Sequence, residues 1–473
     1  MKILLLKHAE EYIQGGILGH SPNAVSIYPP LGLEYIGSTL ENEGHKVEII
    51  DFGAEALSKE QLKNSLTSSD AVGIGVYTNN YKNTADFAKM IKELAPKIHL
   101  IIGGPHCIFF KKQSLIDIPY ADIAVELEGE HVFPDLVRVF EGKKKLSDVH
   151  GIYYRENNKI KAGKSPQIID NLDDLAFPAR HLVYRYDYGN LPWGYSFKKK
   201  FTSMITSRGC PFNCRFCTRY NNIVKDWGYR KRSADNVVRE IQEINDKYKS
   251  VAIVDDNFLA DIKRAHKIFD KLLETGTTLD LIITGARVDS ADKDLYKKMK
   301  KVGVKYLCFG IESGNQDVLD FYNKKITLQQ IQKAVHLAKE MNFTTQATFI
   351  LGAPFETNKY IENTIKFACS LPLDIVIFQP LHYVMGSDLW LEAVKDKKIS
   401  KNEYHVDANS KRGLGNFTEE ELKEYSNKAF RRFYLRPNYL LSQIQKALLH
   451  KDIGHLKIVW KVAISSQWRN ILS

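Results

Sequence analysis

The sequence predicts an α/β protein with two consecutive parallel-sheet domains and a basic helical C-terminal region. Two series of short apolar segments, each followed by a helical pattern, predict the two domains, because apolar strands that alternate with helices form a parallel sheet covered on both faces. Charge sets the third region apart: residues 428–473 carry nine basic and one acidic residue, which is +8 of a net charge of +11. The length of 473 residues is that of two or three domains.

The first domain, residues 1–145, is predicted to hold a doubly wound sheet. Its five expected strands are rich in Ile, Leu and Val: KILLL, KVEIID, AVGIGVY, HLIIGG and IAVEL. Helices are expected between them, including 31–43 and 83–94, and Ser58 with Gln61 has the spacing of a capping box that opens another. Ligands of such sheets bind beyond the carboxyl ends of the strands, where the sequence places the loops YTNNY, GGPHC and EGEH.

Residues 146–200 interrupt this alternation, and their acidic, Pro, Gly and aromatic residues predict a packed linker. Residues 201–390 carry six further strand–helix units, with strands expected at SMITS, VAIVDD, LIITG, VKYLCFG, QATFIL and DIVIFQ. Six such units predict a parallel barrel, complete or partial, whose chemistry lies on the loops that follow the strands. Residues 391–473 form the basic helical region, in which Pro437 is expected in the first turn of a helix.

Composition excludes several classes of protein. No apolar run approaches the ~20 residues of a membrane-spanning helix, and the N-terminal segment is expected to be a buried strand rather than a secretory signal. Six cysteines in 473 residues do not make a disulfide framework, so we expect a protein of the reducing cytoplasm. Because the chain outside the tail is nearly neutral, nucleic-acid binding along the whole protein is not expected.

Three of the six cysteines lie within eight residues, in the segment TSRGCPFNCRFCTRY: Cys210, Cys214 and Cys217. Thiolates at this spacing predict a metal site on the loop after the first barrel strand. Three thiolates hold three irons of a [4Fe–4S] cluster and leave the fourth iron open, which favours a cluster that binds a substrate or cofactor. A zinc site is the alternative, although no histidine lies between His181 and His266 to complete it.

The spacing Cys-x3-Cys-x2-Cys within SRGCPFNCRFC resembles the cluster motif of the radical S-adenosylmethionine (SAM) superfamily, whose fold is a partial (β/α)6 barrel. The resemblance implies that the three cysteines hold the cluster, that SAM chelates the open iron, and that Phe216 lies beside them. It also implies cofactor contacts at later strand ends, which are Asp255, Asp256, Asn257, Arg287, Glu312, Gly352 and Pro354.

The segments PPLGLEYIGSTLENEGHKVEIID, GGPH and EGEHVFPDL resemble the cobalamin-binding domain of one radical SAM subfamily. The implied contacts lie on three strand-end loops and are Thr78, Asn79, Gly103, Gly104, Pro105, His106, Glu128, Gly129 and Glu130. The Asp-x-His-x-x-Gly motif of other cobalamin proteins is missing from the sequence, so we predict that no histidine of the protein ligates cobalt. A nucleotide-binding domain is the alternative, but no G-x-G-x-x-G follows the first strand.

The resemblance implies an enzyme that uses a [4Fe–4S] cluster, SAM and cobalamin to methylate an unactivated carbon. Non-methylating radical chemistry with the same cofactors is one alternative: ring formation, ring contraction or oxidation, as in the anaerobic magnesium-protoporphyrin ester cyclases of this subfamily. A cobalamin or redox sensor without catalysis is another. The implied partners are a small-molecule or lipid substrate and an external electron donor such as ferredoxin or flavodoxin, with no nucleic acid.

The tail HLKIVWKVAISSQWRNIL combines Trp460 and Trp468 with Lys and Arg. A basic amphipathic helix with tryptophan can lie on an anionic membrane surface. One interpretation is therefore a cytoplasmic protein that approaches a lipid or other hydrophobic substrate at the membrane. The other is a solvated basic helix that packs on the barrel.

Overall fold

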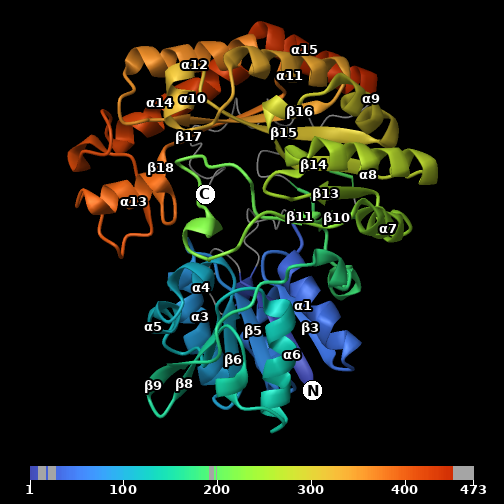
Figure 1. Cartoon of the computed structure of the whole chain (residues 1–473), viewed down its shortest axis with the longest axis vertical. Coiled ribbons are helices and arrows are strands. Elements are labelled where there is room, and N and C mark those ends of the chain that lie inside the picture. The colour runs from blue at the N-terminus through green and yellow to red at the C-terminus, as the bar shows by residue number, and fades with distance from the viewer. Residues whose placement is uncertain (9–16, 20–27, 191–196, 199, 451–473) are drawn as a thin grey trace. The chain divides into compact units, whose positions relative to one another are not determined.

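The computed structural model describes residues 1–8, 17–19, 28–190, 197–198 and 200–450 (Figure 1). The chain divides into two compact units, Met1–Gly189 and Asn190–Ser473, and the division lies inside the segment 146–200. Within the described ranges, no helix is long and apolar enough to cross a membrane. The tail sequence with Trp460 and Trp468 lies outside them.

The first unit contains a seven-stranded sheet in the order β3-β1-β5-β6-β7-β8-β9. Its parallel strands coincide with the five predicted apolar segments: β1 (Lys2–Lys7), β3 (Lys46–Asp51), β5 (Ala71–Gly75), β6 (His99–Gly103) and β7 (Ile123–Val125). Helices α1 (Leu31–Asn42) and α6 (Gly129–Phe140) pack together on one face (Figure 1). On the other face lie α3 (Tyr81–Leu94) and α5 (Gln113–Asp117), together with α2 (Lys59–Thr67), which opens with the predicted capping box and packs on α3. The predicted doubly wound sheet is confirmed.

A hairpin that the sequence analysis did not predict extends this sheet. Strands β8 (Ile152–Glu156) and β9 (Lys159–Ala162) pair antiparallel with β7 and with each other, although they lie in the segment predicted as a linker. Asn157 and Asn158 join them with φ values of 50° and 59°. A two-residue hairpin turn requires these left-handed conformations, and asparagine tolerates them. The pair of asparagines between two β-rich segments was the overlooked signal.

The second unit contains a six-stranded parallel sheet in chain order. The strands match the six predicted segments: β10 (Phe201–Met204), β13 (Ser250–Ile253), β14 (Asp280–Ala286), β15 (Val304–Glu312), β16 (Thr344–Leu351) and β17 (Ile375–Pro380). The helices between them are α7 (Ala234–Asn245), α8 (Ile262–Thr275), α9 (Lys293–Val302), α11 (Leu328–Glu340) and α12 (Asn358–Ser370). In the described part of the chain the edge strands β10 and β17 do not pair with each other, so the barrel is partial.

The region after β17 includes a helix that belongs to the barrel. Helix α14 (Glu419–Tyr434) packs on β17, and the Tyr434 hydroxyl bonds to both the N–H and the carbonyl of Val376 (2.9 and 3.0 Å). Helix α15 (Pro437–His450) begins at Pro437, as predicted. Between β17 and α14 the chain forms α13 (Asp388–Lys395) and a two-stranded ribbon of β18 (His382–Val384) and β19 (His405–Asp407), a strand in a region predicted to be helical.

Candidate functional site

The three clustered cysteines lie on a loop that follows the first barrel strand, after the short strand β11 (Ser207–Arg208). Gly209 opens this loop with φ 84°, and a Cβ there would lie 2.3 Å from the carbonyl oxygen of Gly228. No other residue type fits this position without movement of the backbone. The sequence RGC thus turns the chain sharply away from the strand and into the cysteine loop.

Asp255, at the end of β13, anchors the beginning of the cysteine loop. Its buried carboxylate accepts hydrogen bonds from the N–H and the hydroxyl of Thr206 and from the hydroxyl of Ser207, each at 2.6 Å. Burial raises the pKa of Asp255, while these bonds act in the opposite direction. A residue that the sequence offered as a cofactor contact is thus occupied by bonds to the chain.

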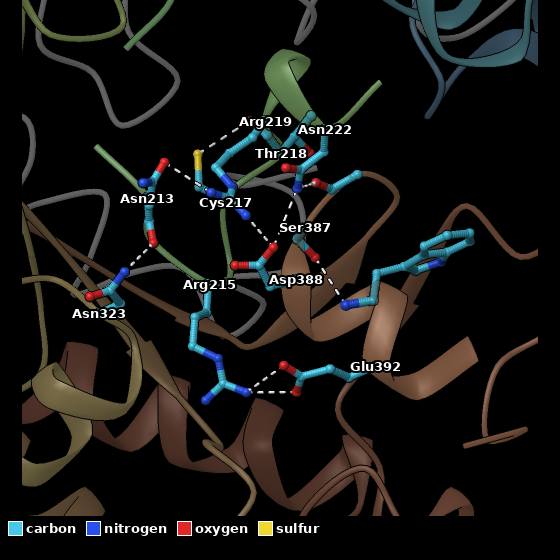
Figure 2. Close-up of polar contacts among 12 residues, drawn as sticks. Asn213, Arg215, Cys217, Thr218, Arg219, Asn222, Asn323, Ser387, Asp388 and Glu392 are labelled. Atoms are coloured by element: carbon cyan, nitrogen blue, oxygen red, sulfur yellow. Dashed lines mark hydrogen bonds and ion pairs between the residues drawn. The ribbon is translucent and has the colours of Figure 1, made fainter. Parts of the chain in front are cut away.

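The far side of the cysteine loop is tied to the segment between β18 and α13 (Figure 2). The Thr218 hydroxyl donates to the Met385 carbonyl (3.2 Å), the Asn222 amide donates to the Gly386 carbonyl (3.0 Å), and Arg219 pairs with Asp388. These contacts restrain the residues that follow the last cysteine.

The residues between the cysteines are held as well. The Arg215 guanidinium donates to both oxygens of the Glu392 carboxylate (2.8 and 2.6 Å), and the backbone N–H of Arg215 donates to the Tyr322 carbonyl (3.0 Å). The Asn323 amide donates to the Asn213 carbonyl (2.7 Å). Figure 2 shows both side-chain interactions, which restrain the spacers of the motif.

The three thiols lie close enough to influence one another electrostatically. Burial raises the pKa of Cys210, and the neighbouring thiol of Cys214 and carboxylate of Asp256 raise it further. Local burial of the thiol also raises the pKa of Cys217, and Cys214, Asp256 and Cys210 raise it further. Thiolates gathered in this way repel one another, and a bound metal cation would offset the repulsion. The donor set therefore fits an iron–sulfur cluster held by three thiolates.

Arg287, at the end of β14, brings a positive charge to this group. Its guanidinium lies 4.0 Å from the Cys214 sulfur, stacks on the Phe212 ring at 3.8 Å and donates to the Lys324 carbonyl (2.6 Å). Asp289 pairs with it at 2.9 Å. Because the side chain is buried and bonded at several points, its charge is fixed in position beside the thiol.

Glu312, at the end of β15, is paired with a lysine that the sequence analysis missed. The Lys324 ammonium donates to Oε1 of Glu312 (2.8 Å), and the Thr348 hydroxyl donates to Oε2 (3.2 Å). Burial lowers the pKa of Lys324, but the Glu312 carboxylate and the Cys214 thiol together outweigh this effect, and the pKa lies above its ordinary value. Lys324 also lies over the Phe216 ring, 5.7 Å from its centre. The structure thus brings Glu312 and Phe216 together through Lys324.

Two further features mark the end of β15 as a close-fitting site. Glu312 has φ 72°, a left-handed conformation that is uncommon for a residue with a side chain. A Cβ at Gly310 would lie 2.5 Å from Oε1 of Glu312 and 2.9 Å from Nζ of Lys324, so a side chain there would displace the charged ends of the pair. Backbone strain of this kind gathers at functional sites.

Asn257 lies just beyond β13 and presents a buried polar group that a ligand could use. The side chain is 3% exposed, and neither its amide oxygen nor its nitrogen has a hydrogen-bond partner among the described residues. Buried amides without partners are costly. The adjacent strand carries Gly285 at this point, and a Cβ added there would lie 2.3 Å from the Asp255 carbonyl oxygen. Glycine thus allows the two strand ends to approach closely. The orphaned amide fits a polar cofactor at this strand end.

The turn after β16 contains Gly352 and Pro354, and a second missed carboxylate shapes it. Gly352 has φ 102°, and the N–H groups of Gly352 and Ala353 donate to one oxygen of Glu356 (2.6 and 2.8 Å). Burial raises the pKa of Glu356 to about 7. The sequence signal for this turn was Glu356, a carboxylate four residues after Gly352, close enough to accept hydrogen bonds from the backbone of the turn.

In the first unit, the predicted contacts lie at the carboxyl ends of three neighbouring strands, β5, β6 and β7. The order β3-β1-β5-β6-β7 reverses direction between β1 and β5, which is where doubly wound sheets bind ligands. Thr78 and Asn79 follow β5 at this point and reach the surface. No described atom lies within 4 Å of a Cβ built on Gly75, so the described part of the chain does not crowd this strand end. This edge is therefore where the first unit would hold a ligand such as cobalamin.

The other predicted contacts of this unit are more enclosed. Gly103 and Gly104 end β6, and a Cβ on Gly104 would lie 3.1 Å from the Val76 carbonyl, so the loop packs on its neighbour. Pro105 begins the short helix α4 (Pro105–Phe110), and Gly129 begins α6. Glu128 and Glu130 are buried, and Glu128 accepts a hydrogen bond from the Ile169 N–H (2.8 Å).

His106 is fully buried inside the first unit. Its ring stacks on Tyr81 (centroids 4.9 Å apart), lies against Phe110 and places Nε2 3.3 Å from the Asp117 carboxylate. A ligand would reach this side chain only if these packing contacts were given up.

Comparison with known proteins agrees with this architecture. A sequence family described as the radical SAM superfamily matches residues 204–368, and one described as a B12-binding domain matches residues 22–137. The chain is 32% identical to an uncharacterized methyltransferase, PH0819, of Pyrococcus horikoshii over 94% of this chain and 95% of that protein. It is 26% identical to cytidylyl-2-hydroxyethylphosphonate methyltransferase of Streptomyces wedmorensis over 86% of each chain.

A solved structure shares the fold. The cobalamin-dependent radical SAM enzyme OxsB, solved with aqua-cobalamin bound, superposes with a TM-score of 0.70 and 17% identity over 97% of this chain and 72% of that chain.

Proposed function

The chain belongs to the radical SAM superfamily as a cobalamin-dependent enzyme, and on this premise we propose that it methylates an unactivated carbon of its substrate. The observation that carries the proposal is that the similarity to a protein named as a methyltransferase runs through both domains rather than through the barrel alone. When bound, the [4Fe–4S] cluster and SAM supply a 5′-deoxyadenosyl radical and cobalamin supplies the methyl group, since cofactors carry the hard chemistry.

We propose that Cys210, Cys214 and Cys217 hold the cluster. Asp255 fixes the start of their loop, and the bonds to the segment between β18 and α13 fix its end. Arg287 holds a positive charge 4.0 Å from the Cys214 sulfur, beside the site of the cluster. These residues position the cluster and add no chemistry of their own.

We assign the binding of SAM to the strand ends beside the cysteine loop. The unpartnered amide of Asn257 offers a donor and an acceptor for the polar end of SAM. The Glu312 carboxylate, oriented by Lys324, offers an acceptor for its ammonium group. The turn at Gly352, stiffened by Glu356, forms a rigid backbone edge for the adenine. In each case a contact that the fold has already ordered costs less entropy on binding.

Anaerobic reconstitution with cobalamin and methyl-labelled SAM tests the reaction. The enzyme, a reductant and fractionated cell extracts are combined, and we expect S-adenosylhomocysteine, 5′-deoxyadenosine and a product heavier by one labelled methyl group in place of hydrogen. Formation of 5′-deoxyadenosine with no S-adenosylhomocysteine and no added carbon would instead support ring formation, ring contraction or oxidation. If SAM is not cleaved with any reductant, the sensor hypothesis gains support.

We also propose that the substrate is a lipid or another hydrophobic compound that the C-terminal region approaches at a membrane. Support comes from α15, whose side chains Leu441 and Ile444 are 60% and 46% exposed shortly before the basic tail. Liposome flotation with anionic vesicles compares the full chain with one that ends at His450. This truncation keeps Tyr439, whose hydroxyl bonds to the Asp374 carbonyl (2.7 Å). Equal flotation of the two proteins would show that the residues after His450 are not needed for binding, and no flotation of the full chain would reject the membrane contact.

A further inference from the structure

The ribbon beyond the sixth barrel strand gathers three side chains of types that ligate metals. In the antiparallel pair β18–β19, His382 lies opposite Asp407 and Val384 lies opposite His405. Alternate residues of a strand share a face, so His405 and Asp407 point the same way, and the cross-strand pairing adds His382 to that face. Nδ1 of His382 lies 2.6 Å from Oδ1 of Asp407, and Nε2 of His405 lies 3.7 Å from the same oxygen.

The spacing of these groups is close to that of a coordination sphere. One ligand atom of each residue lies within 4.8 Å of the other two. Ligand atoms that share a tetrahedral ion at about 2.1 Å lie roughly 3.4 Å apart. The 3.7 Å separation therefore needs almost no adjustment, and the 2.6 Å separation must open by roughly 0.8 Å, which a small rotation of the partly exposed His382 side chain supplies.

The composition of the group favours a cation of a particular class. Asp407 is a carboxylate at neutral pH and would repel a phosphate or another anion. Two imidazoles and one carboxylate are ligands of zinc and ferrous iron. Magnesium and calcium take oxygen ligands instead.

We propose that His382, His405 and Asp407 bind a divalent ion of the zinc or ferrous iron type, separate from the cluster of the cysteine loop. Three protein ligands leave at least one coordination position open for water or for an oxygen atom of the substrate. The side chains are 28%, 47% and 24% exposed, so solvent and an ion can reach them.

The ribbon is continuous with the segment that holds the cysteine loop. Met385 and Gly386 directly follow β18, and their carbonyl oxygens accept the hydrogen bonds from Thr218 and Asn222. The Met385 N–H donates to the carbonyl of Tyr404, the residue before β19 (2.9 Å). A metal that joins β18 to β19 therefore also stiffens the support of the cysteine loop.

Zinc alone is the probe, because added iron would also enter the cluster site. The full-length protein, reconstituted with cluster and cobalamin, is equilibrated with zinc chloride and desalted, and zinc, iron and cobalt are measured by mass spectrometry. The variants are His405→Ala, Asp407→Asn and the matched control His336→Ala, a surface histidine of α11 whose Nδ1 bonds to the Gln332 carbonyl. We expect about one retained zinc ion per wild-type or control chain, and at least tenfold weaker zinc binding in both triad variants.

Iron and cobalt contents serve as internal standards. Unchanged iron shows that zinc has not displaced the cluster and that the second unit, which carries the ribbon, is folded. Unchanged cobalt shows that the first unit is folded. Asp407→Asn keeps the shape of the side chain. If His405→Ala does not fold, the zinc content of Asp407→Asn alone tests the proposal. Equal zinc in the wild type and the triad variants would overturn the proposal. So would a wild type that retains no zinc, which would leave a plain histidine–aspartate hydrogen bond.

Discussion

The carboxylate of Asp255 provides a quantitative test of how the cysteine loop is held. It is 3% exposed and accepts three hydrogen bonds of 2.6 Å from Thr206 and Ser207. Hydrogen bonds to charged groups contribute roughly 1.5–3 kcal/mol each. Burial disfavours the carboxylate and offsets part of this sum. We therefore expect Asp255→Ala to lower the free energy of unfolding by about 3–5 kcal/mol.

Asp255→Asn is the matched control. Its amide oxygen still accepts from the Thr206 N–H, and its amide nitrogen can donate to the two hydroxyls, so we expect a loss of about 1–2 kcal/mol. Calorimetry of the cofactor-free protein measures both variants. For a domain of this size 1 kcal/mol shifts Tm by about 2–4 °C, so the alanine variant should unfold about 10 °C lower and the asparagine variant about 4 °C lower. Iron content after reconstitution should fall in the alanine variant only.

One result would refute this reasoning. If Asp255→Ala unfolds within about 2 °C of the wild type while its affinity for SAM falls at least tenfold, the carboxylate serves the cofactor rather than the loop. That result would restore the role that the sequence resemblance implied.

The remaining predictions concern the same barrel. Lys324→Met leaves the Glu312 carboxylate buried without its ammonium partner, so we expect a loss of about 3–5 kcal/mol; the double variant with Glu312→Gln should recover most of the lost Tm, and no recovery would argue against the pair. Burial raises the pKa of Glu356 to about 7, so the folded state favours the protonated carboxyl. The contribution of Glu356 to the free energy of unfolding is therefore complete below pH 4.5 and is lost as pH rises through about 7. In urea denaturation the wild type should therefore lose about 3 kcal/mol more than Glu356→Gln between pH 4.5 and about pH 8, and parallel curves would contradict the raised pKa. Changing any one of the three loop cysteines to Ala should abolish 5′-deoxyadenosine formation and leave the cobalamin absorbance unchanged; a variant with full SAM cleavage would exclude that cysteine from the cluster.

The regular elements could be predicted because their signals are local. The eleven parallel strands are apolar segments that can be read one at a time, and the capping box at Ser58 is complete within four residues. The hairpin β8–β9 was missed although its signal is equally local. The reason is that Asn157 and Asn158 lie in a polar segment that was interpreted by its composition as a linker.

The site could be predicted only in part. The spacing of the cysteines identified the loop, but the bonds that hold it come from distant residues such as Asp255 and Met385. Asp255 and Asn257 look equivalent in the sequence VDDNF. The structure distinguishes them, since one is saturated by hydrogen bonds from the chain and the other has none among the described residues.

The sequence by itself determined the order of the parallel strands and of the helices between them, the two-domain α/β class and the place of the cysteine loop, because periodicity, turn residues and ligand spacing are properties of short segments. Only the tertiary structure decided which side chains meet. Lys324 binds Glu312, which lies twelve residues away and has a left-handed backbone conformation. His382 meets Asp407, twenty-five residues away, because the two are paired in the register of the β18–β19 ribbon. Such pairings depend on how separate strand ends and ribbons are brought together, and no local pattern specifies that.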